Sequence, residues 1–131
     1  MERTTAMAGA GLGKTAVTCG DTPGFIVNRL LVPYLAQAVA MRERDVASRD
    51  DIDAGMKLGA GHPMGPLMLA DYVGLDLCLS ILEGWTAKFP DEPAFHVPGL
   101  LRSMVGEGRM GRKSGRGFHT WDGNKVIPDE A

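Results

Sequence analysis

The sequence predicts an all-α domain built from about five helices. Apolar residues recur every three or four positions from Thr22 onward, which is the period of one helix face. Each of these segments carries residues typical of helix ends, and short connections rich in glycine and proline join the segments. The length of 131 residues suits a single domain with one core.

The beginning of the chain differs from the rest. Residues 1–20 are mostly small and rich in glycine, and only Thr15–Cys19 has the pattern of a strand. Because no partner strand is evident in the chain, we expect this orphan strand to pair with a sheet outside the chain or to lie loosely before the helices. We therefore divide the chain into a leader with one strand, residues 1–20, and a helical domain, residues 21–131.

The first helix is predicted to begin at Thr22, whose hydroxyl can cap it. Pro23 then occupies the opening position, where a missing N–H is harmless. The apolar pattern continues to about Met41. Pro33 stands in the middle of this helix, and its ring clashes with the carbonyl of Arg29, so we expect a bend there.

The second helix is predicted to begin after Ser48, because acidic residues follow at the positive end of the helix dipole, and to end at Gly59. Asp50, Asp51 and Asp53 could also suggest a cation site. Their spacing lacks the other oxygen ligands of a calcium loop, so helix capping is the better explanation of all three.

Three further helices are predicted, the first of them at the end of the rigid connector Gly61–Pro66. Pro66 opens a short helix that ends near Gly74, and another helix follows at once. A final short helix follows Pro98, and the chain beyond Gly106 is basic and rich in glycine. The apolar face of the middle helix consists of Leu75, Cys78, Leu82, Trp85 and Phe89.

The composition excludes several functional classes. A formal net charge of -2 gives no global attraction to nucleic acid, and no run of 18 apolar residues could span a membrane. Cys19 and Cys78 lie in apolar surroundings, which favours buried thiols over a disulfide. Met1–Thr4 lacks the apolar core of a secretion signal, and the sequence leaves the cellular compartment open.

Glycines at the start of the chain do not form a nucleotide site. Gly9–Thr15 ends like a phosphate-binding loop, but Ala8 replaces the required first glycine and no strand precedes the segment. Lys14 also stands where a dinucleotide-binding fingerprint needs its third glycine. We interpret this segment as a flexible leader.

None of the histidines has the spacing of a metal ligand or lies beside a cysteine nucleophile. His62 is the best functional candidate because of its proline-rich connector, although a partly exposed loop histidine is the simpler interpretation. His96 and His119 are widely separated from it and from each other.

A basic segment follows the last helix. Arg109, Arg112, Lys113 and Arg116 alternate with glycines and could hold phosphates. We favour a solvated tail in which the aromatic residues at positions 118 and 121 pack against the helices. Nucleic-acid binding is weaker still, because aromatic residues are few.

Asn28 is the most informative single residue, because it is an amide in an otherwise apolar helix. We expect it to be buried, where an unpaired amide costs roughly 1 to 3 kcal/mol. It should therefore be held by backbone groups or await a ligand. From the residues alone we favour a structural bridge to a neighbouring loop.

Several blocks of sequence resemble the C-terminal domain of the 3-hydroxyacyl-CoA dehydrogenase family. The segment Asp21–Leu35 is similar to the start of that domain. Gly59–Pro66 with Asp71–Asp76 resembles its second block, and Gly111–Phe118 resembles its closing motif. The blocks follow the order and spacing of the family.

The resemblance implies a helical fold like the C-terminal domain of 6-phosphogluconate dehydrogenase. It also implies an enzyme that oxidises the 3-hydroxyl of L-3-hydroxyacyl-CoA with NAD in fatty-acid β-oxidation. In the family, a separate domain binds NAD and carries a catalytic histidine. We expect this domain to be missing here, with Thr15–Cys19 as its last strand, so that the isolated chain is inactive.

The resemblance also implies roles for single residues. Asn28 matches the active-site asparagine that holds the substrate and the catalytic histidine in register. Pro63, Met64 and Leu69 match positions that line the acyl pocket, although packing explains these three equally well. The implied partners are acyl-CoA and a second copy in a homodimer. Two alternatives remain, a noncatalytic helical interaction module and the same domain of a short-chain 3-hydroxybutyryl-CoA dehydrogenase.

Overall fold

The computed structural model describes residues 3–7, 16–20 and 26–128, and the chain divides into two compact units. The first unit is Met1–Leu31 and the second is Val32–Ala131. Thr22, Pro23 and the glycine-rich segment Gly9–Thr15 lie outside the described residues, so the predictions made for them stay predictions.

The first unit contains a two-stranded antiparallel sheet. Strand β1 (Arg3–Met7) pairs with β2 (Ala16–Gly20), with Arg3 opposite Gly20 and Met7 opposite Ala16. The predicted strand at Thr15–Cys19 is therefore present, but our expectation that it lacks a partner in the chain was wrong. The partner was missed because β1 is short and has no alternation of apolar and polar residues.

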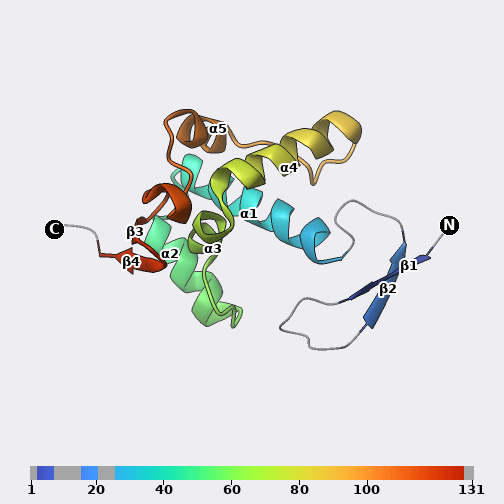
Figure 1. Ribbon diagram of the computed structural model, residues 1–131, viewed down its shortest axis with the longest axis horizontal. Helices are drawn as coiled ribbons and strands as arrows, with labels where there is room; N and C mark the ends of the chain where they lie inside the picture. Colours follow the sequence, from blue (N-terminus) through green and yellow to red (C-terminus); the bar gives the residue numbers. More distant parts are fainter. Residues whose placement is uncertain (1–2, 8–15, 21–25, 129–131) are drawn as a thin grey trace. The chain divides into compact units, whose positions relative to one another are not determined.

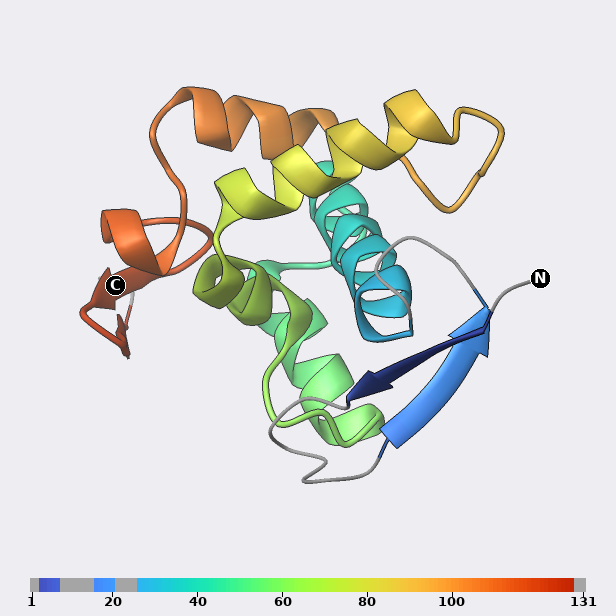
Figure 2. The same ribbon diagram turned by 45° about the vertical axis from the view of Figure 1, so that its right-hand side comes forward.

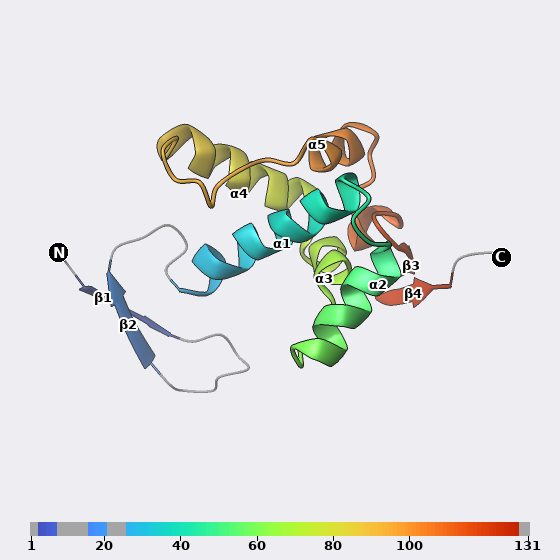
Figure 3. The ribbon, with the colours of Figure 1, turned by 180° about the vertical axis from the view of Figure 1, so that it is seen from behind.

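Helix α1 (Val27–Glu43) begins in the first unit and supplies much of the core of the second. Small and β-branched side chains cover the part after Leu31, so that part can pack on several sides: its buried residues are Val32, Pro33, Leu35, Ala36, Ala38, Val39 and Ala40. Figures 1 and 3 show it running between the α4–α5 pair and the α2–α3 pair. The bend expected at Pro33 stays a prediction.

Helix α2 (Arg49–Ala54) begins as the sequence predicts. Ser48 caps it, because the Oγ atom of Ser48 accepts a hydrogen bond of 3.1 Å from the backbone N–H of Asp51. A π-helical turn, η2 (Gly55–Gly59), continues the helix to the predicted end at Gly59. Figure 2 shows α2 and η2 as one continuous rod that leads into the connector before α3.

The remaining helices also match their predicted limits. They are α3 (Pro66–Val73), α4 (Leu75–Lys88) and α5 (Gly99–Gly106), and α4 packs beside α5 (Figure 1). In α4, Leu75, Cys78 and Leu82 are buried, whereas Trp85 is half-buried against Phe95 at a ring distance of 4.9 Å. Among the described residues, no helix is long and apolar enough to cross a membrane.

The segment after α5 folds back on the helices. It contains a short 3-10 turn, η3 (Arg112–Ser114), and an antiparallel hairpin of β3 (Thr120–Asp122) and β4 (Lys125–Ile127). The sequence did not predict this hairpin. Trp121 is buried and Phe118 is half-buried, which confirms that these aromatic residues pack against the helices.

Candidate functional site

Asn28 lies on the first turn of α1, and its side chain is exposed. The prediction that this amide is buried was wrong. Its apolar neighbours are exposed as well, at 56% for Val27 and 67% for Leu30, because the buried part of α1 begins only at Val32. The amide is therefore open to a ligand or to another protein surface.

The other predicted site residues lie close together in the second unit. Pro63 and Met64 belong to the connector between η2 and α3, where Pro63 is exposed and Met64 is half-buried. Leu69 is half-buried on the first turn of α3, and its N–H donates to the carbonyl of Gly65 at 2.9 Å. These three residues thus flank the junction at Gly65. Asn28 belongs to the first unit.

Both ends of the connector are fixed by hydrogen bonds. At its start, the N–H of His62 donates to the carbonyl of Met56 at 3.2 Å. The hydroxyl of Tyr34, on α1, lies 3.3 Å from Nδ1 of His62, and the two rings meet edge to face at 5.4 Å. His62 is therefore the partly exposed loop histidine of the simpler interpretation, and it is also bonded to Tyr34.

Asp53 fixes the other end of the connector, which corrects our prediction that it caps its own helix. Its carboxylate is buried and accepts hydrogen bonds from the N–H groups of Leu67 at 2.8 Å and Met68 at 3.1 Å. It thus caps α3 from α2, because no residue at the start of α3 supplies a side-chain cap. The backbone of Gly65 packs directly on Asp53, and a Cβ at Gly65 would lie 2.3 Å from the Cβ of Asp53.

His119 completes this arrangement, and sequence reasoning missed its role. Its ring is buried, and Nε2 lies 3.0 Å from Oδ2 of Asp53. His119 and Asp53 are 66 residues apart in the sequence, so no local spacing could have revealed the pair.

Asp71 fastens the C-terminal segment to α3. Its fully buried carboxylate accepts hydrogen bonds from the backbone N–H groups of Phe118 and His119, each at 2.8 Å, and from Nε1 of Trp121 at 2.9 Å. Burial raises the pKa of Asp71, although the hydrogen bonds from Trp121, His119 and Phe118 oppose that shift. The absence of a side chain at Gly117 lets the backbone approach this carboxylate closely.

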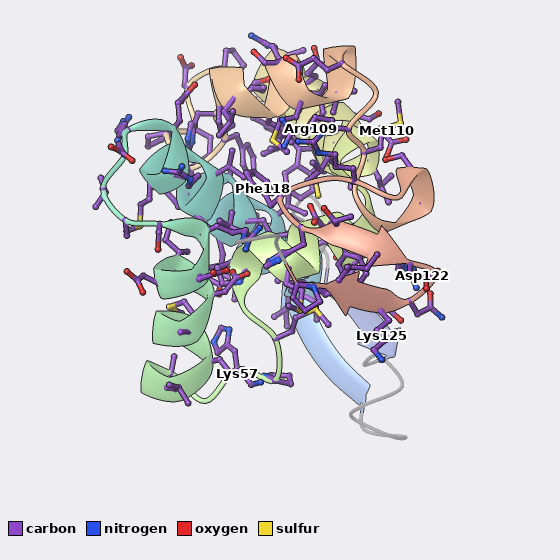
Figure 4. The ribbon with its side chains drawn as sticks, turned by 90° about the vertical axis from the view of Figure 1, so that its left-hand side faces the viewer. Lys57, Arg109, Met110, Phe118, Asp122 and Lys125 are labelled. Carbon is purple, nitrogen blue, oxygen red and sulfur yellow. The ribbon has the colours of Figure 1, made fainter. Side chains whose placement is uncertain are left out.

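Most of the basic residues after α5 are bonded within the protein. Arg109 donates to the carbonyl of Gly117 at 3.1 Å, and the guanidinium of Arg112 stacks 3.6 Å above the ring of Tyr72. Lys113 pairs with Asp76, and this bond lowers the pKa of Asp76. Figure 4 shows Arg109 and Phe118 near each other in this segment, whereas Lys57 lies on η2, away from both. These cations fasten the segment and do not form an open phosphate cradle.

A hollow of about 810 Å³ lies elsewhere in the second unit. It is bordered by the end of α1, the start of α2, and α5; among its lining residues are Arg42, Arg49, Leu100, Met104 and Phe118. Pro63, Met64 and Leu69 do not line it, so the hollow is separate from the connector.

The described residues do not fit a dinucleotide. Their sheets are two antiparallel hairpins, whereas NAD sites of the doubly wound kind are built on parallel strands. The described residues also contain no group of three or more side chains that could hold a metal ion. Cys78 is buried and burial raises its pKa to about 11, which makes its thiol a poor nucleophile.

Comparison with known sequences identifies the family. The sequence profile of the 3-hydroxyacyl-CoA dehydrogenase C-terminal domain matches residues 24–121. The chain belongs to the 3-hydroxyacyl-CoA dehydrogenase family. The match covers Asn28, the connector, Asp71 and the C-terminal segment as far as Trp121.

Members of the family from distant organisms are similar to this domain. A probable 3-hydroxyacyl-CoA dehydrogenase of Caenorhabditis elegans is 58% identical over 113 residues, which cover 86% of this chain and 37% of the relative. The mitochondrial hydroxyacyl-coenzyme A dehydrogenase of Mus musculus is 54% identical over 110 residues, or 84% of this chain and 35% of that protein. The chain thus spans little more than a third of the relatives that it matches.

A solved structure confirms the fold of this 3-hydroxyacyl-CoA dehydrogenase domain. The (S)-3-hydroxybutyryl-CoA dehydrogenase PaaH1 of Ralstonia eutropha superposes with a TM-score of 0.74 at 43% identity, over 78% of this chain and 36% of that one. The prediction of a mainly helical domain with about five helices is therefore confirmed. The family is NAD-dependent and acts on acyl-CoA.

Proposed function

We propose that this chain forms the substrate-facing part of an NAD-dependent L-3-hydroxyacyl-CoA dehydrogenase, in which Asn28 orients the reacting oxygen at C3. Membership of the family is the observation that carries this proposal. The exposed position of Asn28 at the start of α1 supports it, because an orienting amide has to reach the substrate.

The chemistry explains why an amide suits this place. A hydride can leave C3 only as the proton of the 3-hydroxyl is drawn away, and negative charge then gathers on the oxygen. An amide N–H can donate a hydrogen bond to that oxygen without exchanging a proton itself. We propose that Asn28 does this, while the proton acceptor is a histidine of a nucleotide-binding domain.

We further propose that the connector and α3 form the wall for the acyl chain. Pro63, Met64 and Leu69 are apolar and lie on both sides of a fixed junction, which suits contact with a hydrocarbon chain. A longer acyl chain and a short hydroxybutyryl chain are both alternatives for the substrate, because relatives of this domain are named for 3-hydroxyacyl-CoA and for 3-hydroxybutyryl-CoA.

We also propose that two copies of this chain form a homodimer. Large apolar side chains are exposed in the second unit, among them Val46 at 63% and Leu58 at 82%. Such residues are typical of surfaces that a second copy covers. Light scattering should give about twice the monomer mass of 14.0 kDa, and a monomer at high concentration would count against the dimer.

The function is tested by reconstitution. The purified chain, mixed with acetoacetyl-CoA and NADH, should not consume NADH. The same chain joined behind the nucleotide-binding domain of a relative should consume it steadily. Activity of the isolated chain would contradict the proposal that a nucleotide-binding domain supplies the proton-accepting histidine. An inactive but folded fusion would favour the second candidate, a noncatalytic helical interaction module.

A further inference from the structure

The predicted acyl wall is held at both of its ends, at His62 and at the start of α3, and Asp53 holds the end at α3. Pro63 and Met64 precede Gly65, and Leu69 is bonded to it through the 2.9 Å backbone hydrogen bond. The carboxylate of Asp53 holds the next two N–H groups along the chain, those of Leu67 and Met68. A shift of this carboxylate would therefore displace the end of the wall at the start of α3.

A single histidine holds that carboxylate in place from the C-terminal segment. Oδ2 of Asp53 accepts one hydrogen bond from Met68 and lies 3.0 Å from Nε2 of His119. His119 is itself fixed, because its backbone N–H donates to Asp71 at 2.8 Å. Since Asp71 belongs to α3, these bonds close a circuit through α2, α3 and the C-terminal segment.

Two neighbouring elements bring titratable groups toward this pair. Asp71 on α3 accepts a hydrogen bond from the backbone N–H of His119. Burial raises the pKa of Tyr34 on α1, and the charge of Asp53 raises it further. The Asp53–His119 hydrogen bond requires a proton on Nε2 of His119, because an ionised carboxylate can only accept. Nε2 can carry a proton in the neutral ring and carries one in the charged ring.

We propose that Asp53 and His119 are positioning residues that set the acyl-chain selectivity of the enzyme by holding the wall formed by Pro63, Met64 and Leu69. This inference rests on the proposed function. The pair acts on the wall rather than on the reacting atoms, because its hydrogen bonds end at the start of α3. Loss of the pair should therefore change the binding of long acyl chains. The turnover of a short substrate should stay nearly unchanged.

The test uses the chain joined to the nucleotide-binding domain of a relative, with acetoacetyl-CoA and 3-oxodecanoyl-CoA as substrates. His119→Leu removes the bond to Asp53, whereas His119→Gln keeps an N–H donor at a similar place. Asp53→Asn is the second variant, because it retains the volume of Asp53 but loses one acceptor. Asp51→Asn on the same helix is the control, since the side chain of Asp51 is exposed.

We expect His119→Leu and Asp53→Asn to change the ratio of kcat/KM for the long substrate to that for the short one by about fivefold or more. The change should lie mainly in KM for the long substrate, and kcat for acetoacetyl-CoA should stay within about twofold. His119→Gln should recover the wild-type ratio, and Asp51→Asn should not alter it. Amide hydrogen exchange at Leu67 and Met68 should become faster in His119→Leu.

Three results would overturn the inference. One is an unchanged ratio in both Asp53→Asn and His119→Leu, even if their stability falls. Another is an equal loss of activity toward both substrates. A third is a failure of His119→Gln to recover the ratio when it folds as well as the wild type. An inactive wild-type fusion is a different result, because it removes the proposed function and the inference with it.

Discussion

The Nε2 atom of His119 lies 3.0 Å from Oδ2 of Asp53, across 66 residues of sequence. The carboxylate at this contact caps α3, and the histidine belongs to the segment that Asp71 fastens to the same helix. The start of α3 is thus connected through these two side chains to the C-terminal segment.

The close approach of Gly65 to Asp53 predicts a large effect of a single methyl group. A Cβ at Gly65 would lie 2.3 Å from the Cβ of Asp53, so Gly65→Ala should lower the free energy of unfolding by about 3 kcal/mol through overpacking. Urea denaturation of the purified chain measures this change.

Gly55→Ala is the matched control for that substitution. A Cβ at Gly55 would meet nothing within 4 Å, and this residue has the helical angles φ -58 and ψ -45. It should therefore raise the free energy of unfolding by about 0.5 to 1 kcal/mol. Similar effects of the two substitutions would contradict the packing described at Gly65.

Asp71→Asn should destabilise the domain, because its N–H₂ group replaces one of the two oxygens that together accept three hydrogen bonds. We expect a loss of about 3 kcal/mol in the free energy of unfolding. Near-ultraviolet circular dichroism should also show a less ordered Trp121, whose indole bonds to Asp71.

The same variant gives a prediction about pH. Burial raises the pKa of Asp71 above its ordinary value of 3.8, so the folded chain holds this proton more tightly than the unfolded chain. The stability that comes from protonated Asp71 is fully present below pH 3.8. It is lost as the pH rises through the pKa of Asp71 in the folded chain. The difference in unfolding free energy between wild type and Asp71→Asn should therefore shrink from pH 4 toward neutral pH. A difference that grows with pH would contradict this assignment.

Cys78 should be unreactive in the folded protein. Burial raises its pKa to about 11, so at pH 8 only about one thiol in a thousand is ionised. In a Cys19→Ser background, Ellman's reagent should modify Cys78 at least about a hundredfold more slowly in the native chain than in urea. Equal rates in the two conditions would show that the thiol is not buried.

The helices could be predicted from the sequence because their signals are local. Ser48 and Asp51 are three residues apart, and Pro66 marks the start of α3 by its own geometry. The hairpin of β3 and β4 was missed because each strand has only 3 residues, too few to show a period. Its position depends on Trp121 and Asp71, which lie in different parts of the sequence.

The candidate site was predicted only in part, for a similar reason. Apolar neighbours suggested that Asn28 is buried, but they cannot distinguish a core from a surface that another domain or ligand covers. The spacing of Asp50, Asp51 and Asp53 suggested local caps, whereas Asp53 reaches a different helix. The role of His119 has no local signal at all, since its partner lies 66 residues away.

The most direct test of the proposed function compares two amides on one helix. Asn28 and Gln37 are both exposed on α1, and only Asn28 is proposed to contact the reacting oxygen. In the fusion with a nucleotide-binding domain, Asn28→Ala should lower kcat for acetoacetyl-CoA reduction by about a hundredfold or more. Gln37→Ala should leave it within about twofold. An unchanged kcat in a folded Asn28→Ala fusion would contradict the account and favour the noncatalytic module.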